Sequence, residues 1–165
     1  LICVTLYKKK NDMPELRQTI NTAMKTAMKE KDTVSLSTIR LILAAIKERD
    51  INTRASSGQD GISEEEVLSL LQSMIKQRQE SSRMYNEAKR PELAEREEEE
   101  ISVIQGFLPE QLSADEVGSA VAGLIDEVGA ESIKDMGKVM AALKTQYAGK
   151  LDMTLASSVV KEKLG

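Results

Sequence analysis

The stretch Phe107-Leu-Pro-Glu-Gln-Leu-Ser113 divides the chain into two helical blocks. Pro109 cannot continue a helix, because it lacks a backbone N–H, and it pushes Leu108 towards an extended conformation. Ser113 suits the start of a new helix, since Glu116 stands three residues further on and completes a capping box. These residues predict that one helix ends near Phe107 and that a second helical block begins near residue 114.

Both blocks show the apolar spacing of amphipathic helices, and no segment alternates apolar and polar residues for long enough to form a strand. We therefore predict an all-α fold. It consists of an N-terminal bundle of about four helices followed by a smaller C-terminal domain of three helices. The expected helices cover about 15–30, 33–51, 63–89, 92–107, 114–128, 136–147 and 153–163.

The predicted domain boundaries follow from these helices. Residues 13–108 form the N-terminal helical domain, and residues 109–165 form the C-terminal, tail-like domain. Residues 1–12 fit neither domain, and we expect them to be a disordered extension upstream of a natural start at Met13-Pro14. Residues 52–62 are rich in turn formers and predict a mobile loop, which includes the segment Ala55-Ser-Ser-Gly58.

The composition excludes several classes of chemistry. The chain has 165 residues and no histidine, so it lacks Ser-His-Asp and Cys-His catalysis and every His-ligated metal site. Cys3 is its only cysteine, so no intrachain disulfide forms. Only 2% of the residues are aromatic, which argues against a platform that stacks nucleic-acid bases. No apolar run is long enough to span a membrane, and we expect a cytoplasmic monomer that uses no cofactor and no metal.

Charge is unevenly distributed along the chain. Residues 13–90 contain 13 basic and 11 acidic side chains, whereas residues 91–135 contain 2 basic and 13 acidic side chains. Residues 136–165 contain 5 basic and 2 acidic side chains. This pattern excludes a general nucleic-acid coat but allows a local contact through one positive face.

The segment from Lys134 to Lys138 is a candidate anion-binding site. If Asp135 caps the helix that follows, Gly137 lies in the first helical turn, where backbone N–H groups attract phosphate. Two alternatives stay open: Asp135 itself satisfies those N–H groups, or Gly137 permits close helix packing. The full set of candidate nucleic-acid contacts is Lys134, Gly137, Lys138, Lys144 and Lys150, together with Arg40 and Lys47.

Two further groups of charged residues have simpler interpretations. Arg40 and Lys47 share a face of one predicted helix, where they either contact a partner or serve solubility and pairing between helices. The run from Glu97 to Glu100 predicts a solvated acidic face with i, i+4 ion pairs such as Arg96–Glu100. Glu97 lies on the apolar stripe of its helix, so we expect it to pair with Arg78.

Five sequence blocks, in order along the chain, resemble the GatB/YqeY family, and in particular its free-standing YqeY-like members. The resemblance implies an all-helical fold. It also implies kinship with the helical and tail regions of the B subunit of tRNA-dependent amidotransferase, an enzyme that transfers an amide nitrogen from glutamine. The blocks are Leu36–Lys47, Lys76–Ser81, Glu100-Ile101 with the preceding glutamates, Phe107–Ser113 and Lys134–Met140.

Three functional hypotheses follow. In the family the tail region helps to hold tRNA, so the first hypothesis is an accessory module that binds tRNA and has no catalytic residues. The second is a module that docks on an amidotransferase or another translation protein, which the acidic residues 91–135 favour. A self-sufficient amidotransferase is disfavoured, because the chain lacks a nucleotide-binding loop and the Ser-rich amidase motif.

Overall fold

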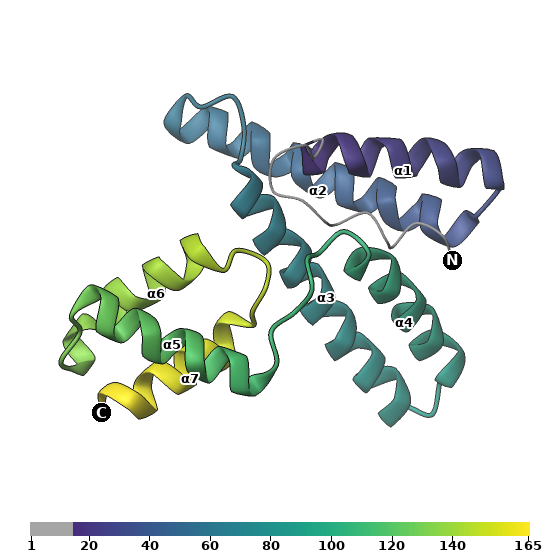
Figure 1. Ribbon diagram of the computed structural model, residues 1–165. Helices are drawn as coiled ribbons and strands as arrows, with labels where there is room; N and C mark the ends of the chain where they lie inside the picture. The colour runs from purple at the N-terminus through teal and green to yellow at the C-terminus, as the bar shows by residue number, and fades with distance from the viewer. Residues whose placement is uncertain (1–14) are drawn as a thin grey trace. The chain divides into compact units, whose positions relative to one another are not determined.

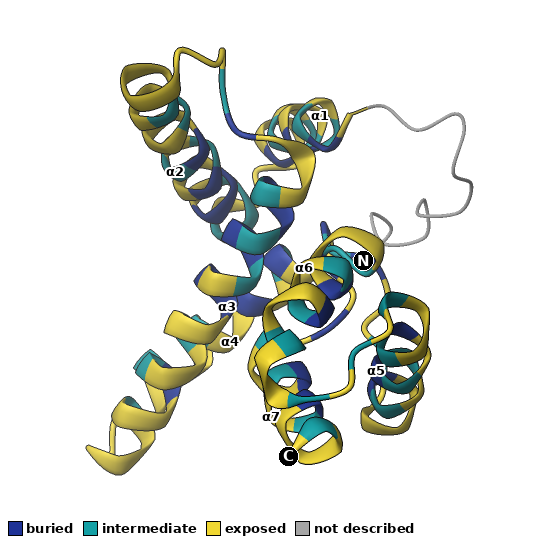
Figure 2. Cartoon of the chain, turned by 90° about the vertical axis from the view of Figure 1, so that its left-hand side faces the viewer, coloured by how far each residue is buried: buried dark blue, intermediate teal, exposed yellow. Residues whose placement is uncertain are grey.

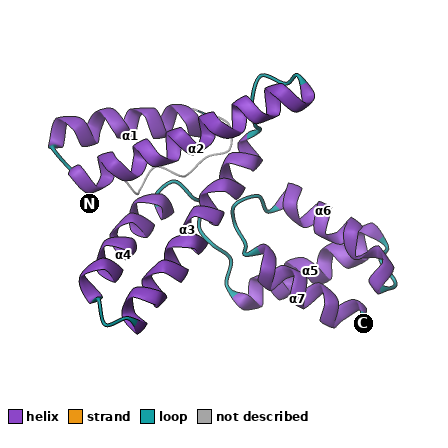
Figure 3. Cartoon of the chain, turned by 180° about the vertical axis from the view of Figure 1, so that it is seen from behind, coloured by secondary structure: helices purple, strands orange, loops and turns teal. Residues whose placement is uncertain are grey.

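The computed structural model describes residues 15–165, and in this range the chain is all-α (Figure 1; Figure 3). No strand occurs among these residues. The predicted fold class is thus confirmed, and the prediction that residues 1–12 are a disordered extension lies outside the described range. The helices are α1 (Leu16–Glu30), α2 (Thr33–Ser57), α3 (Glu64–Glu87), α4 (Pro91–Gln105), α5 (Ala114–Val128), the short 3-10 helix η1 (Ile133–Asp135), α6 (Met136–Gln146) and α7 (Met153–Leu164).

The chain divides into two compact units, Leu1–Pro109 and Glu110–Gly165. In the first unit, α1 and α2 form one helical hairpin and α3 and α4 form another (Figure 1). α2 also packs on α4, and it is buried along one side and exposed along the other (Figure 2). The core of this unit is built from apolar side chains of all four helices, among them Ile20, Ile39, Ile42, Ile46, Val67, Leu71, Ile101 and Ile104.

A polar clamp joins α1, α2 and the loop that leads into α3. The Arg17 guanidinium donates to both carboxylate oxygens of Asp50 at 2.8 Å and to the Ile62 carbonyl at 2.9 Å. Asp50 also accepts from the Ile62 N–H at 2.9 Å. At the start of α1, the Leu16 N–H donates to Glu64 of α3 at 3.2 Å. Three elements distant in sequence are therefore tied together by a few charge-assisted hydrogen bonds.

The predicted loop over 52–62 is wrong in its first half, because α2 continues to Ser57. Gly58 ends the helix in the left-handed conformation, with φ of 71°, which glycine adopts without steric cost. The Ser56 and Ser57 hydroxyls donate to the Thr53 carbonyl, and the clamp at Asp50 holds the preceding turn. Tertiary anchoring thus overrides the weak helix propensity of this segment.

The capping signals correspond closely to the observed helix starts. Ser63 with Glu66, and Ser113 with Glu116, form complete capping boxes at α3 and α5. The Asp32 side chain accepts from the Ser35 N–H at the start of α2. These caps satisfy backbone donors within a few residues, so the sequence alone is sufficient to predict them.

The second unit packs α5, α6 and α7 around a small aliphatic core. The residues after Pro109 close this unit onto the α6–α7 loop: the Leu112 N–H donates to the Lys150 carbonyl at 2.7 Å, and the Gln111 amide donates to the Gly149 carbonyl at 2.5 Å. Leu151 is then held in the core at 1% exposure. The core comprises Val117, Val121, Leu124, Val139, Leu143, Leu151, Ala156 and Val160.

Replacing Gly149 with alanine is expected to destabilise the second unit. Gly149 is buried and has φ of 70°, where a Cβ atom costs about 1–2 kcal/mol. The matched control is Gly123→Ala, at an exposed helical position where an added Cβ meets nothing within 4 Å. This control should stabilise α5 by about 0.5–1 kcal/mol. Hydrogen exchange of residues 114–164 measures both effects, and equal protection in the two variants would contradict the expectation.

Candidate functional site

The exposed side of η1 and α6 carries several lysines near Gly137, where the backbone has no side chain to cover it. Gly137, Ala141 and Lys144 recur at i, i+4 and i+7 and therefore share one face of α6, with Lys138 beside them. Lys134 lies on η1, one turn before Lys138. All five residues are exposed, and no acidic side chain occurs between positions 136 and 151. We call these five residues the lysine face.

The local geometry differs from the predicted cap. Asp135 does not cap α6 with its side chain, because η1 runs directly into the helix and Asp135 has helical backbone angles. Its carboxylate instead accepts from the Glu131 N–H at 3.2 Å and from the Lys138 ammonium at 3.1 Å. These two donors lower the pKa of Asp135 below its ordinary value. Lys138 is thus partly neutralised, whereas Lys134 and Lys144 form no ion pair within the described residues.

Gly137 is not required for close packing, which was one alternative for this position. A Cβ atom built on Gly137 meets nothing within 4 Å, and its backbone is exposed. Open space above the glycine leaves the backbone accessible to a ligand. Lys150 is also exposed, but it lies in the α6–α7 loop beyond the lysine face, and its carbonyl is engaged by Leu112.

Arg40 and Lys47 lie on the exposed side of α2, in the first unit. As predicted, they share a helix face with the exposed Ala44 between them. Neither side chain forms an ion pair within the described part of the chain. They therefore make up a separate positive surface from the lysine face.

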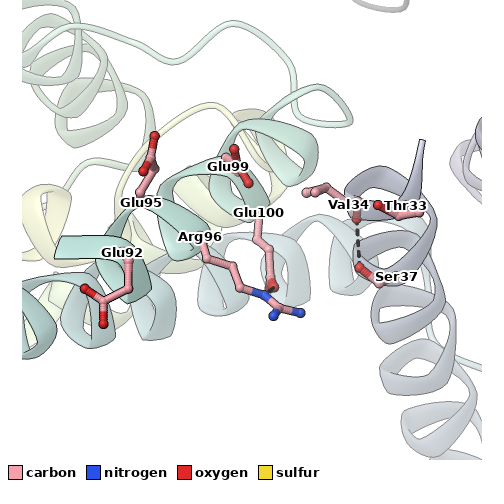
Figure 4. A pocket seen from close by; sticks show the side chains of 8 residues that line it. All are labelled: Thr33, Val34, Ser37, Glu92, Glu95, Arg96, Glu99 and Glu100. Atoms are coloured by element: carbon pink, nitrogen blue, oxygen red, sulfur yellow. Dashed lines mark hydrogen bonds and ion pairs between the residues drawn. The ribbon is translucent and has the colours of Figure 1, made fainter. Parts of the chain in front are cut away.

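An acidic hollow lies between α4 and the first turns of α2 (Figure 4). Thr33, Val34 and Ser37 line it from α2, and the Arg96 side chain reaches towards Glu100 at 3.6 Å. No group of three or more side chains suited to holding a metal ion occurs among residues 15–165. The hollow is negative and repels phosphate. The acidic residues that line it are Glu92, Glu95, Glu99 and Glu100.

The glutamate run is less solvated than predicted, because two of its members tie α4 to α3. Arg78 pairs with Glu100 at 2.9 Å, not with Glu97 as the stripe suggested. The buried Ser82 hydroxyl donates to Glu98 at 2.7 Å. Both side chains of the Arg78–Glu100 pair are less than 15% exposed. Glu100 also forms an ion pair with Arg96. These contacts indicate a structural role for Glu98 and Glu100. The apolar stripe in the sequence correctly identified Arg78 as an ion-pair residue, but it did not identify Glu100 as the partner.

Glu97 is partly buried next to the Arg78–Glu100 pair, and it forms no ion pair within the described residues. Burial raises the pKa of Glu97 above its ordinary value, and repulsion from Glu100 adds to the effect. Arg78 and Arg96 act in the opposite direction. A carboxyl group with a raised pKa in the folded state holds its proton more tightly there than in the unfolded chain.

No helix among the described residues is both long enough and apolar enough to cross a bilayer.

Comparison with known proteins gives the family of the chain. The family of Yqey-like proteins matches residues 17–164. A relative from Pyrenophora tritici-repentis, named altered inheritance of mitochondria protein 41, mitochondrial, is 35% identical over 150 residues, which cover 86% of this chain and 77% of the relative. Proteins with the same name from Clavispora lusitaniae and Lachancea thermotolerans are each 33% identical. Those matches cover 56% and 64% of this chain and only 51% and 55% of the relatives.

The names of these relatives contradict the cytoplasmic location that we inferred from composition. Four of the relatives are named as mitochondrial proteins. The inference was wrong because the absence of an apolar span fits any aqueous compartment. Charge and hydropathy do not distinguish the cytoplasm from the interior of an organelle.

The raised pKa of Glu97 predicts a pH-dependent effect of Glu97→Gln. The proton on Glu97 favours the folded state, and this contribution is complete below the ordinary pKa of 4.5 and is lost as the pH rises through the higher folded value. Glutamine avoids the cost of ionising this site. We therefore expect the variant to be more stable than the parent at pH 7. The difference should vanish below pH 4.5.

Urea unfolding at pH 7 and pH 4 measures this difference. Glu95→Gln is the matched control, because it removes an exposed carboxylate from the same helix and so reports the effect of losing a charge without burial. An equal gain for Glu97→Gln at both pH values would show that the benefit does not come from ionisation.

Proposed function

The chain belongs to the YqeY-like protein family, and on this basis we propose that it is an accessory module that binds tRNA through its second unit and has no catalytic centre of its own. The observation that carries the proposal is the lysine face. Lys134, Lys138 and Lys144 are exposed around the open backbone at Gly137, with Asp135 beside them as the ion-pair partner of Lys138. Exposed lysines favour RNA because they neutralise phosphates and release the counterions condensed on the nucleic acid.

The choice of tRNA as the ligand rests on the resemblance of the sequence blocks to the tail region of the amidotransferase B subunit. The lysine face lies in the block Lys134–Met140, which is part of that resemblance, and continues to Lys144. The acidic hollow on α4 is unsuited to RNA, so we assign the contact to the second unit. Sequence-independent contact with the phosphate backbone fits the scarcity of aromatic side chains.

We also propose that the chain acts in mitochondria, because several of its relatives are named as mitochondrial proteins. Fluorescence imaging of the tagged full-length protein beside a mitochondrial marker tests this location. Overlap with the marker is the expected result, and a diffuse signal outside the organelle would contradict the proposal.

The RNA-binding proposal predicts a salt-dependent affinity for tRNA. Binding of the full chain to total tRNA, measured by filter retention at several salt concentrations, should weaken steeply as salt increases. Lys134→Ala with Lys138→Ala should weaken binding to all tRNAs similarly. If each lysine contacts one phosphate, the slope of log affinity against log salt should decrease by about 1.4–1.8 in magnitude.

The matched control is Lys161→Ala with Lys163→Ala, which removes two exposed charges from α7, outside the lysine face. This control should leave the slope almost unchanged. Equal effects of the two double variants would refute the assignment of the lysine face. An absence of binding at low salt would reject RNA as the ligand and favour docking on a protein.

A further inference from the structure

The outer side of α2 exposes large apolar side chains that the core of the first unit does not use. Leu41 is 50% exposed and Ile51 is 54% exposed. Small exposed residues lie on the same side of the helix, where Figure 2 shows α2 open to solvent. Positions seven residues apart fall on one side of a helix, so the apolar members of this set lie along one seam of α2. The α2 outer face comprises Leu41, Ala44, Ile51 and Ala55, with the polar residues Ser37 and Glu48 in the same register and the cations Arg40, Lys47 and Arg54 along one border. Ser37 also lines the acidic hollow.

A row of cations borders this seam. Arg40, Lys47 and Arg54 recur at every seventh position, and all three are exposed. Arg54 donates to the Asp60 carbonyl at 3.0 Å. A single carboxylate, Glu48, lies within the seam itself, between Ala44 and Ile51. The α2 outer face therefore combines an apolar seam with a positive border along one side.

The shape and spacing of the seam suit another helix. Ala44 and Ala55 are small and permit close approach, and Leu41 and Ile51 alternate with them along the seam and supply apolar area. RNA or another polyanion would pair with the cations but would leave Leu41 and Ile51 in water. An apolar helix without charge would cover the seam but would not use the cationic row. An amphipathic helix with acidic residues along one border satisfies both parts of the surface.

A second copy of this chain is a poorer occupant. If two α2 outer faces packed antiparallel around a two-fold axis, Arg40 would face Arg54 of the other copy and Lys47 would face its own counterpart. Such like-charge pairs oppose association. In a parallel pairing, the cationic row would meet the opposite border, where positions 38, 45 and 52 carry no charge.

We propose that the α2 outer face docks an amphipathic helix of a partner protein, with Asp or Glu residues along the border of its apolar stripe. Leu41, Ala44 and Ile51 contact the apolar stripe of that helix. Arg40, Lys47 and Arg54 contact its acidic border. This assigns Arg40 and Lys47 to a protein partner instead of to RNA, and it does not depend on the lysine face in the second unit.

Two synthetic helical peptides of about 20 residues test the surface. They share a Leu/Ala stripe, and one has Glu along the border where the other has Lys. In fluorescence anisotropy with the full chain, the Glu peptide should bind about tenfold more tightly than the Lys peptide, since several exposed ion pairs differ. Arg40→Glu with Lys47→Glu should reverse this preference, and Ile51→Glu should weaken the binding of both peptides.

Met84→Glu is the matched control, because Met84 is 57% exposed on α3, outside the α2 outer face. Far-UV circular dichroism shows whether each variant keeps its helices. Equal affinity for the two peptides, or the same loss from Met84→Glu as from Ile51→Glu, would overturn the proposal.

A photo-crosslinking residue at position 44 tests the same surface in cells. The expected product is a protein adduct whose cross-linked segment is an acidic amphipathic helix, and it should be lost when Arg40 and Lys47 are reversed in charge. A nucleic-acid adduct, or an adduct that persists after charge reversal, would overturn the proposal.

Discussion

The ion pair between Arg17 and Asp50 is the interaction on which the form of the first unit depends. Asp50 accepts two hydrogen bonds from Arg17 and one from the Ile62 N–H, and the arginine lowers the pKa of the carboxyl group. Gly61 passes so close that a Cβ atom there would lie 2.6 Å from an Asp50 oxygen. Together these contacts fix the loop between α2 and α3, and they hold the last turns of α2 in helical form.

The surface on α2 is a consequence of this clamp. Arg54 and Ala55 follow Asp50, and they reach the same side as Arg40 and Leu41 only because the helix continues past residue 51. A chain that turned into a loop at residue 52 would keep Leu41, Ala44 and Ile51 but only two of the three cations. The clamp thus connects a partly buried structural contact to the geometry of the proposed docking surface.

Charge is distributed so that structure and binding use different residues. On α4, Glu98 and Glu100 hold α3, and the exposed glutamates beside them make a negative surface. The cations of the lysine face and of the α2 outer face take no part in this contact between α3 and α4, and they are exposed to solvent. The family assignment agrees with the sequence blocks, whereas the location inferred from composition required correction.

The sequence by itself determined the all-α class, the apolar stripes, the break at Pro109 and the caps at Ser63 and Ser113. These features depend on residues within one or two helical turns of each other, so local stereochemistry is sufficient to predict them. Only the tertiary structure decided the end of α2, the pairing of Arg78 with Glu100, and the 3-10 turn that displaces Asp135 from its expected cap. Each of these depends on how helices rotate and approach one another in space. A change in rotation of one residue position, about 100° around a helix, selects a different partner without any change in the local sequence signal.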